Sequence, residues 1–191
     1  MKRIAMIDNY DSFTYNLVHY IEGVDEVILD VFYNDQVSIE TLEPYDAIIF
    51  SPGPGLPSEA GKMSEIIAHF FHKKNMLGVC LGHQAIAEFM GAKLKNLNTV
   101  YHGVKTPVHI IKEGHPLFNN IPHPFQAGRY HSWVVDSDHL PDEIIINAVD
   151  SDNNIMAFQH VSLPVYGVQF HPESIMTEYG NEMIQQWIKS L

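Results

Sequence analysis

The only cysteine of the chain lies in a segment that favours nucleophilic chemistry. Gly78-Val79-Cys80-Leu81-Gly82 joins an apolar stretch of strand length to a helix-like stretch. This is the G-x-S-x-G nucleophile turn with Cys in place of Ser, and its glycines leave room for a sharp strand-to-helix bend. Such a turn would hold Cys80 at a helix N-terminus, where the helix dipole favours the thiolate. The N–H of Leu81 would then point toward a developing oxyanion.

The pentapeptide alone also fits an inert residue, because a lone cysteine after an apolar strand packs as a small hydrophobe. A thiol nucleophile needs an imidazole base, and the base needs an acceptor that orients it. His171 and Glu173 supply both groups directly after a strand-like stretch, Val165–Phe170. In an extended chain residues i and i+2 project to the same side, so Glu173 can accept the ring N–H of His171. His83 is the competing base, and we expect it to point along the helix as a packing or hydrogen-bonding group.

A second element that could contact a substrate is the loop Ser51–Pro57. It contains two glycines and three prolines in seven residues, which gives a rigid backbone that another group can approach closely. Its N–H groups could bind a carboxylate or an oxyanion. Taken alone the loop also fits an ordinary turn, and it lacks the Gly-Lys-Ser/Thr ending of a phosphate-binding loop.

The elements that must position these residues alternate between strands and helices in the first two thirds of the chain. The pattern predicts strands at Arg3–Asp8, Val27–Tyr33, Asp46–Ser51 and Met76–Cys80, and helices at Asp11–Glu22 (capped by Asp11 or Ser12), Gly61–Lys73 and Gln84–Met90. This order predicts an α/β fold with a mostly parallel sheet flanked by helices. In such sheets sites lie at the carboxyl ends of strands, which points to Asp8–Ser12, Ser51–Leu56 and Cys80–Gln84.

The second half of the chain predicts a small antiparallel elaboration of that sheet. Short strand-like stretches occur at Thr99–Lys112, Glu143–Asp150, Ile155–His160 and Pro164–Phe170, and a helix is predicted at Glu178–Leu191. The four residues from Ser151 to Asn154 fit a hairpin turn. No linker or repeat interrupts the chain, so we expect a single domain, residues 1–191.

The composition limits the kinds of partner. The formal net charge is −12, which disfavours nucleic acid and anionic membranes, although acidity also simply keeps proteins soluble. A neutral or zwitterionic substrate fits this charge better than an anionic one. One cysteine allows no intramolecular disulfide, which suits a reducing compartment. Because the sequence shows no signal peptide and no apolar stretch of about 20 residues, we expect a cytoplasmic location.

Several motifs together give the chain a resemblance to a known family. They are Ser51-Pro-Gly-Pro-Gly55, Gly78-Val-Cys-Leu-Gly-His-Gln84, Arg129-Tyr-His-Ser132 and Gly167-Val-Gln-Phe-His-Pro-Glu173. With them the chain resembles class I glutamine amidotransferases over nearly its whole length. The opening segment Asp8-Asn-Tyr-Asp-Ser-Phe-Thr14 resembles the small subunits of anthranilate synthase and aminodeoxychorismate synthase in particular.

The resemblance implies a flavodoxin-like glutaminase domain in which Cys80 attacks the side-chain amide of L-glutamine. It implies that His171 acts as base and then acid, that Glu173 orients it, and that the N–H groups of Gly53 and Leu81 form the oxyanion hole. By the family pattern the glutamine-binding residues are Gly53, Pro54, Gly55, Gln84, Ser132 and Trp133. The family usually has Leu at the last position, so we expect contact there through the backbone.

The resemblance also implies a partner, a larger chorismate-binding synthase subunit that receives the ammonia in a hetero-oligomer. No metal or cofactor is expected in this chain, and Mg²⁺ is expected only in the synthase partner. His69 and His72 have a spacing that can suit a metal, but a solvated helix face is the simpler interpretation. The loops Asp8–Thr14 and Pro57–Gly61 are the expected contacts with the partner.

Three alternatives remain open from the sequence. The tryptophan pathway (anthranilate) and the folate pathway (aminodeoxychorismate) use small subunits that look alike, and we favour the first. A γ-glutamyl hydrolase or cysteine peptidase on the same scaffold would use Cys80 and His171 equally well, although Gln84 and Ser132 favour a pocket for free glutamine. The last alternative is a flavodoxin-like binding module without activity.

Overall fold

The elements of the fold are taken from a computed structural model that describes residues 1–138 and 140–191. The helices are α1 (Thr14–Glu22), α2 (Ile39–Leu42), α3 (Met63–Phe70), α4 (Leu81–Phe89) and α5 (Gly180–Ser190), with short 3-10 helices η1 (Pro57–Glu59) and η2 (Pro116–Phe118). The strands are β1 (Lys2–Asp8), β2 (Val27–Tyr33), β3 (Ala47–Phe50), β4 (Asn75–Val79), β5 (Leu94–Asn96), β6 (Val104–Ile110), β7 (Phe125–Arg129), β8 (Trp133–Val135), β9 (Ile144–Val149), β10 (Ile155–His160) and β11 (Val165–Val168).

A large mixed sheet forms the centre of the molecule. Within the described residues it has nine strands in the order β2-β1-β3-β4-β11-β10-β9-β6-β7. The strands from β2 to β11 pair in parallel, and those from β10 to β7 pair antiparallel. The mostly parallel α/β sheet with an antiparallel part in the second half is therefore confirmed. The antiparallel strands extend the same sheet, and β5 and β8 form a separate two-stranded ladder.

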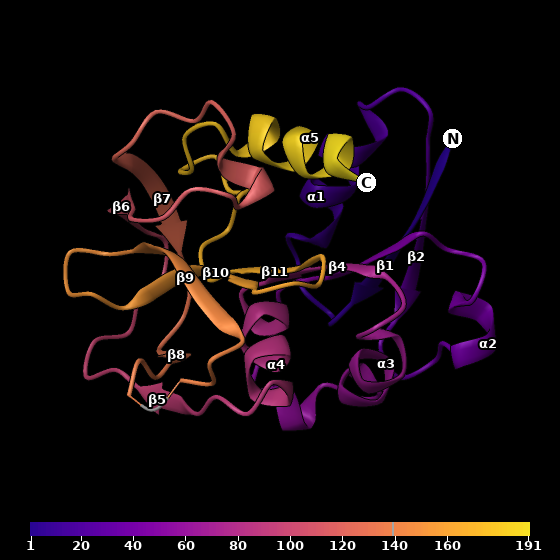
Figure 1. The fold of residues 1–191 in the computed structure, drawn as a ribbon, viewed down its shortest axis with the longest axis horizontal. Helices are drawn as coiled ribbons and strands as arrows, with labels where there is room; N and C mark the ends of the chain where they lie inside the picture. The colour runs from indigo at the N-terminus through magenta and orange to yellow at the C-terminus, as the bar shows by residue number, and fades with distance from the viewer. Residues whose placement is uncertain (139) are drawn as a thin grey trace.

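Helices cover both faces of the parallel part of the sheet. Figure 1 shows α1 and α5 on one face and α3 and α4 on the other. Strand β1 contributes alternate residues to the two hydrophobic cores on either side of the sheet. Ile4 and Met6 pack with α1 and α5, whereas Ala5 and Ile7 pack with α3 and α4. A strand buried on both faces reads as an unbroken apolar run, as the sequence pattern of this stretch predicted. Each fully buried Ile stabilises the fold by about 1.5–3 kcal/mol relative to exposure.

The start of the first helix differs from the prediction. Helix α1 begins at Thr14, and Phe13 stands at the N-cap position without a side-chain cap, so the prediction of an Asp11 or Ser12 cap was wrong. The carboxylate of Asp11 instead accepts a hydrogen bond from the Phe13 N–H at 2.7 Å, and the Thr14 hydroxyl donates to Asp8 at 2.8 Å. These contacts hold the loop that precedes the helix, at the carboxyl end of β1.

The second half contains strands that the sequence pattern missed. The stretch predicted as Thr99–Lys112 forms only β6, the last predicted strand ends at Val168, and β5, β7 and β8 were not predicted. Strand β7 has the sequence Phe-Gln-Ala-Gly-Arg, and its last three residues are all buried. Residues on both faces of β7 are buried, so polar and apolar residues do not alternate along it. The strand therefore lacks the period of two by which a half-buried strand is recognised in a sequence.

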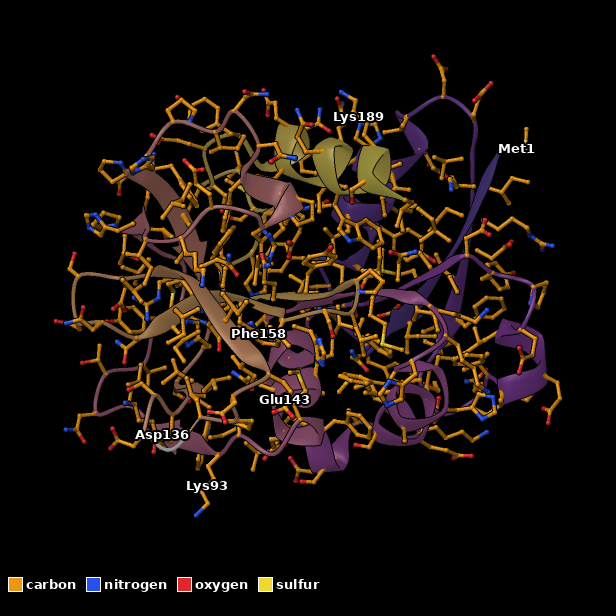
Figure 2. All side chains as sticks on the ribbon, viewed as in Figure 1. Met1, Lys93, Asp136, Glu143, Phe158 and Lys189 are labelled. Atoms are coloured by element: carbon orange, nitrogen blue, oxygen red, sulfur yellow. The ribbon has the colours of Figure 1, made fainter. Side chains whose placement is uncertain are left out.

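The side chains fill the space between these layers. Figure 2 shows Phe158 of β10 in the interior beside α4, while Lys93 and Lys189 extend outward from the molecule. Among residues 1–138 and 140–191, no helix has the length and apolar character needed to cross a membrane.

Candidate active site

Cys80 occupies a strained turn between β4 and α4. Its backbone has φ +50° and ψ −98°, a conformation that costs a non-glycine residue about 1–3 kcal/mol. The turn is held on both sides, since the Cys80 N–H donates to the Val168 carbonyl at 2.8 Å and the Gln84 N–H donates to the Cys80 carbonyl at 3.1 Å. The thiol therefore lies at the N-terminus of α4, as the sequence predicted for a nucleophile turn.

The two glycines of the turn are required by close packing. A Cβ on Gly78 would lie 2.4 Å from backbone atoms of Gly82, and a Cβ on Gly82 would lie 2.5 Å from the carbonyl oxygen of Phe50. Neither gap admits a carbon atom. Helix α4 thus begins in direct contact with the ends of β3 and β4, and this packing sets the direction in which Cys80 points.

His171 and Glu173 follow β11, which pairs in parallel with β4. The parallel register brings the residues after both strands to the same edge of the sheet. The Nδ1 of His171 lies 2.6 Å from Oε1 of Glu173, and both residues are buried, at 3% and 2% exposure. The His171 N–H donates to the Gly128 carbonyl at 3.1 Å, and the Thr177 hydroxyl donates to the His171 carbonyl at 2.5 Å. The backbone and the imidazole ring of His171 are thus both fixed.

The charge environment favours a protonated His171. Burial lowers the pKa of His171, but the nearby Glu173 carboxylate and then Cys80 outweigh it and raise the pKa well above its ordinary value. The Nε2 atom of His171 is buried and has no hydrogen-bond partner among the described residues. His171 and Cys80 line the same hollow, so Nε2 is the ring atom available for proton exchange with the sulfur.

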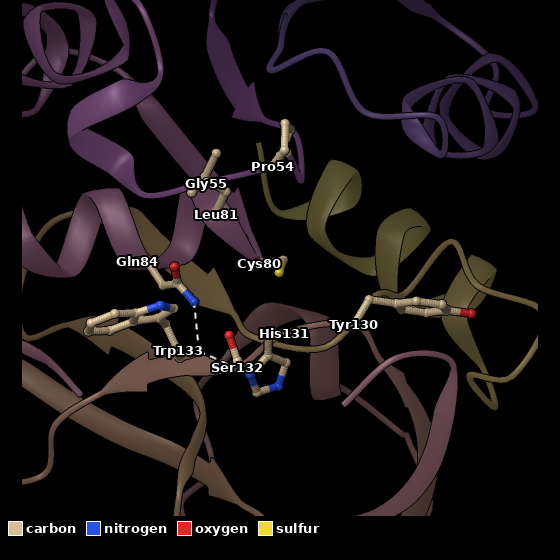
Figure 3. Close-up of a pocket in the computed structure, with 10 residues that line it drawn as sticks. Pro54, Gly55, Cys80, Leu81, Gln84, Tyr130, His131, Ser132 and Trp133 are labelled. Atoms are coloured by element: carbon tan, nitrogen blue, oxygen red, sulfur yellow. Dashed lines mark hydrogen bonds between the residues drawn. The ribbon is translucent and has the colours of Figure 1, made fainter. Parts of the chain in front are cut away.

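A second hollow, of about 170 Å³, also adjoins Cys80 (Figure 3). All the residues expected to bind substrate or an oxyanion line it, together with Cys80 and two residues that were not predicted. The full lining is Gly53, Pro54, Gly55, Cys80, Leu81, Gln84, Tyr130, His131, Ser132 and Trp133. The structure therefore brings together three segments that are far apart in the sequence.

The Ser51–Pro57 loop is fixed by buried polar contacts. A Cβ on Gly53 would lie 2.6 Å from the Cβ of Asn9, so only glycine fits there. The Asn9 N–H donates to the Ser51 hydroxyl at 2.9 Å, its carboxamide donates to the Ser51 carbonyl at 2.8 Å, and Asn34 donates to Asn9 at 2.9 Å. The backbone of the loop is thereby held against the end of β1, beside Cys80.

Trp133 faces the pocket through its backbone. At the two ends of the β5–β8 ladder, the Leu97 N–H donates to the Ser132 carbonyl and the Asp136 N–H donates to the Lys93 carbonyl. Hydrogen-bonded and non-hydrogen-bonded pairs alternate along an antiparallel ladder, so the pair of Trp133 with Asn96 is a non-hydrogen-bonded one. The backbone N–H and carbonyl of Trp133 therefore point away from β5. Its carbonyl accepts from the Gln84 carboxamide at 2.8 Å, drawn as a dashed line in Figure 3. The backbone N–H of Trp133 lies on the same side of the strand.

The competing base, His83, is a packing residue. Its side chain is fully buried and lies against Phe158, with ring centroids 4.8 Å apart. Burial lowers the pKa of His83 to about 3, which keeps the ring neutral at physiological pH. It does not line the hollows that contain Cys80.

The two histidines with metal-like spacing lie away from this site. His69 contacts Glu43 at 3.2 Å and Lys73 at 2.9 Å, and its ring packs against Phe70. Across residues 1–138 and 140–191, no group of three or more His, Cys, Asp or Glu side chains is placed to hold a metal ion.

The sequence and fold match those of known proteins. The sequence profile described as glutamine amidotransferase class-I matches residues 5–191, so the chain belongs to the class I glutamine amidotransferase family. It is 45% identical over 190 residues to anthranilate synthase component 2 of Lactococcus lactis, with 98% of this chain and 94% of the relative covered. It is 42% identical over 189 residues to aminodeoxychorismate/anthranilate synthase component 2 of Bacillus subtilis, covering 98% and 96%.

Other relatives extend this comparison. The chain is 42% identical over 191 residues to the bifunctional protein TrpGD of Thermotoga maritima, which covers 98% of this chain but 32% of that longer protein. A Thermoplasma acidophilum protein described as a subunit of GMP synthase has a similar structure, with a TM-score of 0.86, 26% identity, and coverage of 99% and 93%. A glutamine amidotransferase of Thermotoga maritima shares the fold, with a TM-score of 0.77, 18% identity, and coverage of 99% and 81%.

Three residues near the sulfur were missed by the sequence analysis. Tyr130 and His131 line the pocket, and the Gln169 carboxamide donates to Cys80 Sγ at 3.5 Å. All three lie within motifs that carried the family resemblance, but no role was assigned to them. The period of two that led from Glu173 to His171 extends back to Gln169, and this signal could have found it.

Proposed function

We propose that the chain hydrolyses L-glutamine to glutamate and ammonia, with Cys80, His171 and Glu173 as a triad. The observation that carries the proposal is that Cys80 lines both hollows. One hollow is lined by the buried His171, and the other is lined by Gly53, Leu81 and Gln84. A nucleophile, a base and a polar pocket thus converge on one atom.

The reaction balances with these groups alone. The Cys80 thiolate attacks the amide carbon of glutamine, and the N–H groups of Gly53 and Leu81 stabilise the oxyanion. Nε2 of His171 donates its proton to the leaving nitrogen, so ammonia departs and a γ-glutamyl thioester remains. His171 then takes a proton from water as the water attacks the thioester, glutamate leaves, and the Cys80 thiolate and protonated His171 are restored. Glu173 holds Nδ1–H throughout and stabilises the imidazolium.

The pocket suits a zwitterion with a short polar side chain. We assign the backbone N–H of Trp133 to the α-carboxylate, because it lies on the same side of the strand as the carbonyl that Gln84 contacts, and Ser132 lines the pocket beside it. The Gln84 carboxamide oxygen then accepts from the α-ammonium group. Pro54 and Gly55 line the side of the pocket nearer the solvent, since both are exposed. A pocket of about 170 Å³ is small, which favours a free amino acid over a peptide.

The ammonia passes to a chorismate-binding synthase subunit, which forms anthranilate. This part of the proposal rests on relatives whose names include anthranilate synthase component 2. The alternative product is 4-amino-4-deoxychorismate, since the Bacillus subtilis relative is named for both synthases. Any Mg²⁺ belongs to the partner's chemistry and not to this chain, and the lone thiol nucleophile suits the cytoplasm. The loops Asp8–Thr14 and Pro57–Gly61 contact the partner, because residues of the first line the hollow that holds His171.

The first test is release of glutamate and ammonia from glutamine, with and without chorismate and each synthase subunit. We expect release that a synthase subunit stimulates and that Cys80→Ser abolishes. The subunit that stimulates identifies the pathway. Absence of release under every condition, together with a Cys80 that a glutamine-analogue alkylator leaves unlabelled, would support the binding-module alternative.

A paired substitution tests the partner contact. Ser58 is exposed in the Pro57–Gly61 loop, and Ser162 is exposed in the turn that precedes β11, at the opposite end of the parallel strands. We expect Ser58→Arg to reduce stimulation by the synthase while leaving unstimulated hydrolysis unchanged, and Ser162→Arg to change neither. Equal stimulation of both variants and the wild type would exclude this loop from the interface.

A further inference from the structure

We propose that Gln169 is a positioning residue for glutamine hydrolysis, which holds the sulfur of Cys80 and the carboxamide of Gln84 in one directed hydrogen-bond network. This inference rests on the proposed function, because it concerns the same reaction. Gln169 touches the nucleophile and a pocket residue, and its own side chain is fully buried.

The register of the sheet places Gln169 beside Cys80. Strands β4 and β11 pair in parallel, with Val79 opposite Val168, and the Cys80 N–H donates to the Val168 carbonyl at 2.8 Å. Gln169 is the next residue after Val168, and its own N–H donates to the Met156 carbonyl at 2.9 Å. Its backbone is therefore fixed between β10 and the nucleophile turn.

The Trp133 carbonyl can only accept a hydrogen bond, and this fixes the direction of the hydrogen bonds from Gln84 to Gln169 and from Gln169 to Cys80. The Trp133 carbonyl lies 2.8 Å from the Gln84 carboxamide, so the Gln84 –NH₂ group must face it. The same nitrogen lies 3.0 Å from the Gln169 carboxamide, which must therefore present its oxygen. The Gln169 –NH₂ group is then left to donate to Cys80 Sγ, at 3.5 Å.

A buried ion pair fixes the other end of the network. Arg129 contacts Asp150 at 2.7 Å, and its Nε donates to Nε2 of His131 at 3.1 Å. A guanidinium cannot accept a hydrogen bond, so Nε2 of His131 must be unprotonated and Nδ1 must carry the proton. Nδ1 donates to the Trp133 carbonyl at 3.0 Å. That carbonyl accepts from two sides, which prevents a flip of the Gln84 carboxamide.

Two consequences follow for the reaction. A hydrogen bond donated to sulfur favours the thiolate over the thiol, so Gln169 adds to the effect of the helix N-terminus on Cys80. Both protons of the Gln84 –NH₂ group are used within the protein, so its oxygen is the atom left to accept from the substrate. Gln169 thus affects both thiol acidity and glutamine affinity. The charged and titratable groups that line the two hollows together with Cys80 are Tyr10, Asp11, His102, Tyr130, His131 and His171, and Glu173 contacts His171.

Three substitutions separate these effects. Gln169→Leu removes both hydrogen bonds. Gln169→Glu has nearly the same shape and can still accept from Gln84, but its carboxylate cannot donate to sulfur. Gln84→Leu removes the pocket carboxamide and leaves the donor to Cys80 in place. Gln159→Leu is the matched control, because Gln159 lies in β10 of the same sheet and contacts Asn147 at 3.0 Å.

The readouts are the pH dependence of Cys80 alkylation by iodoacetamide without glutamine, and KM and kcat for glutamine. We expect both Gln169 variants to slow alkylation at neutral pH about tenfold, because the thiolate loses the hydrogen bond that Gln169 donates. We expect Gln169→Leu and Gln84→Leu to raise KM about tenfold or more, and Gln169→Glu to leave KM near that of the wild type. The control should change neither quantity.

The proposal fails if Gln169→Leu and Gln169→Glu, folded by circular dichroism, alkylate with the pH profile of the wild type. It also fails if Gln159→Leu produces the same changes, because the effect would then be general to the sheet. If Gln169→Leu does not fold, Gln169→Glu still tests the effect on Cys80 alkylation, and Gln84→Leu still tests the effect on KM for glutamine. A wild type that alkylates as expected but releases no ammonia would contradict the proposed function and leave the contact between Gln169 and sulfur supported.

Discussion

Replacement of Glu173 by Gln tests the triad most directly, because it keeps the shape of the side chain and removes its charge. In the structure Oε1 of Glu173 lies 2.6 Å from Nδ1 of His171, and both residues are buried. A Gln side chain can present its –NH₂ group to Nδ1. The ring proton then moves to Nε2, the atom that must exchange a proton with Cys80.

The expected loss follows from that change of tautomer. Positioned general acid–base groups contribute about 10²–10⁴-fold to rate, so we expect kcat for glutamine hydrolysis to fall within that range. KM should change little, because Glu173 does not line the pocket beside Gln84. The assay is ammonia release at saturating glutamine. Glu178→Gln is the control, since Glu178 is exposed and its contact with Lys105, at 3.4 Å, is a surface pair of little energetic weight.

The same substitution changes how stability depends on pH. The pKa of folded His171 lies above its ordinary value of 6.5 because of Glu173 and Cys80. A raised folded pKa stabilises the protein fully below the unfolded pKa, and this contribution is lost as pH rises through the folded pKa. The free energy of unfolding of the wild type should therefore exceed that of Glu173→Gln most below about pH 6.5, and the gap should narrow at alkaline pH. Urea unfolding at several pH values measures it.

The reasoning about this pair would be refuted by a Glu173→Gln protein that hydrolyses glutamine at the wild-type rate. A gap in stability that is the same at every pH would separately contradict the raised pKa of His171. If Glu178→Gln loses activity to the same extent, the effect is not specific to the carboxylate beside the imidazole.

Three further predictions concern packing and charge. A methyl group at Gly82 would lie 2.5 Å from a carbonyl oxygen of β3, so Gly82→Ala should cost about 1–3 kcal/mol in thermal unfolding and reduce Cys80 alkylation; an unchanged melting temperature would contradict this. Asp150→Ala leaves the buried Arg129 guanidinium without its partner at 2.7 Å and should cost about 3–5 kcal/mol in urea unfolding, whereas exposed Asp152→Ala should cost little. His83→Leu should keep glutamine hydrolysis near the wild-type rate, and a loss comparable with that of a base substitution would make the imidazole a participant.

Local sequence determined the elements that carry the chemistry. Apolar runs of strand length mark β1, β3 and β4, because strands buried on both faces have no polar positions. The glycines around Cys80 mark a turn that no bulkier residue allows. The spacing of His171 and Glu173 marks a pair on one side of an extended segment. Each of these signals lies within a few residues, so one sequence is enough to show it.

Only the tertiary structure decided which of these segments meet. The register of β4 with β11 places Gln169 beside Cys80, and this pairing joins residues that are far apart in the chain. Strands β7 and β8 had no alternating pattern, so Tyr130 and His131 were not expected at the pocket. The sequence already favoured His171 over His83 as the base, but the complete burial of His83 is a property of the assembled fold. Sequence periods show which positions are buried, but they do not show which residues pack against one another in the assembled core.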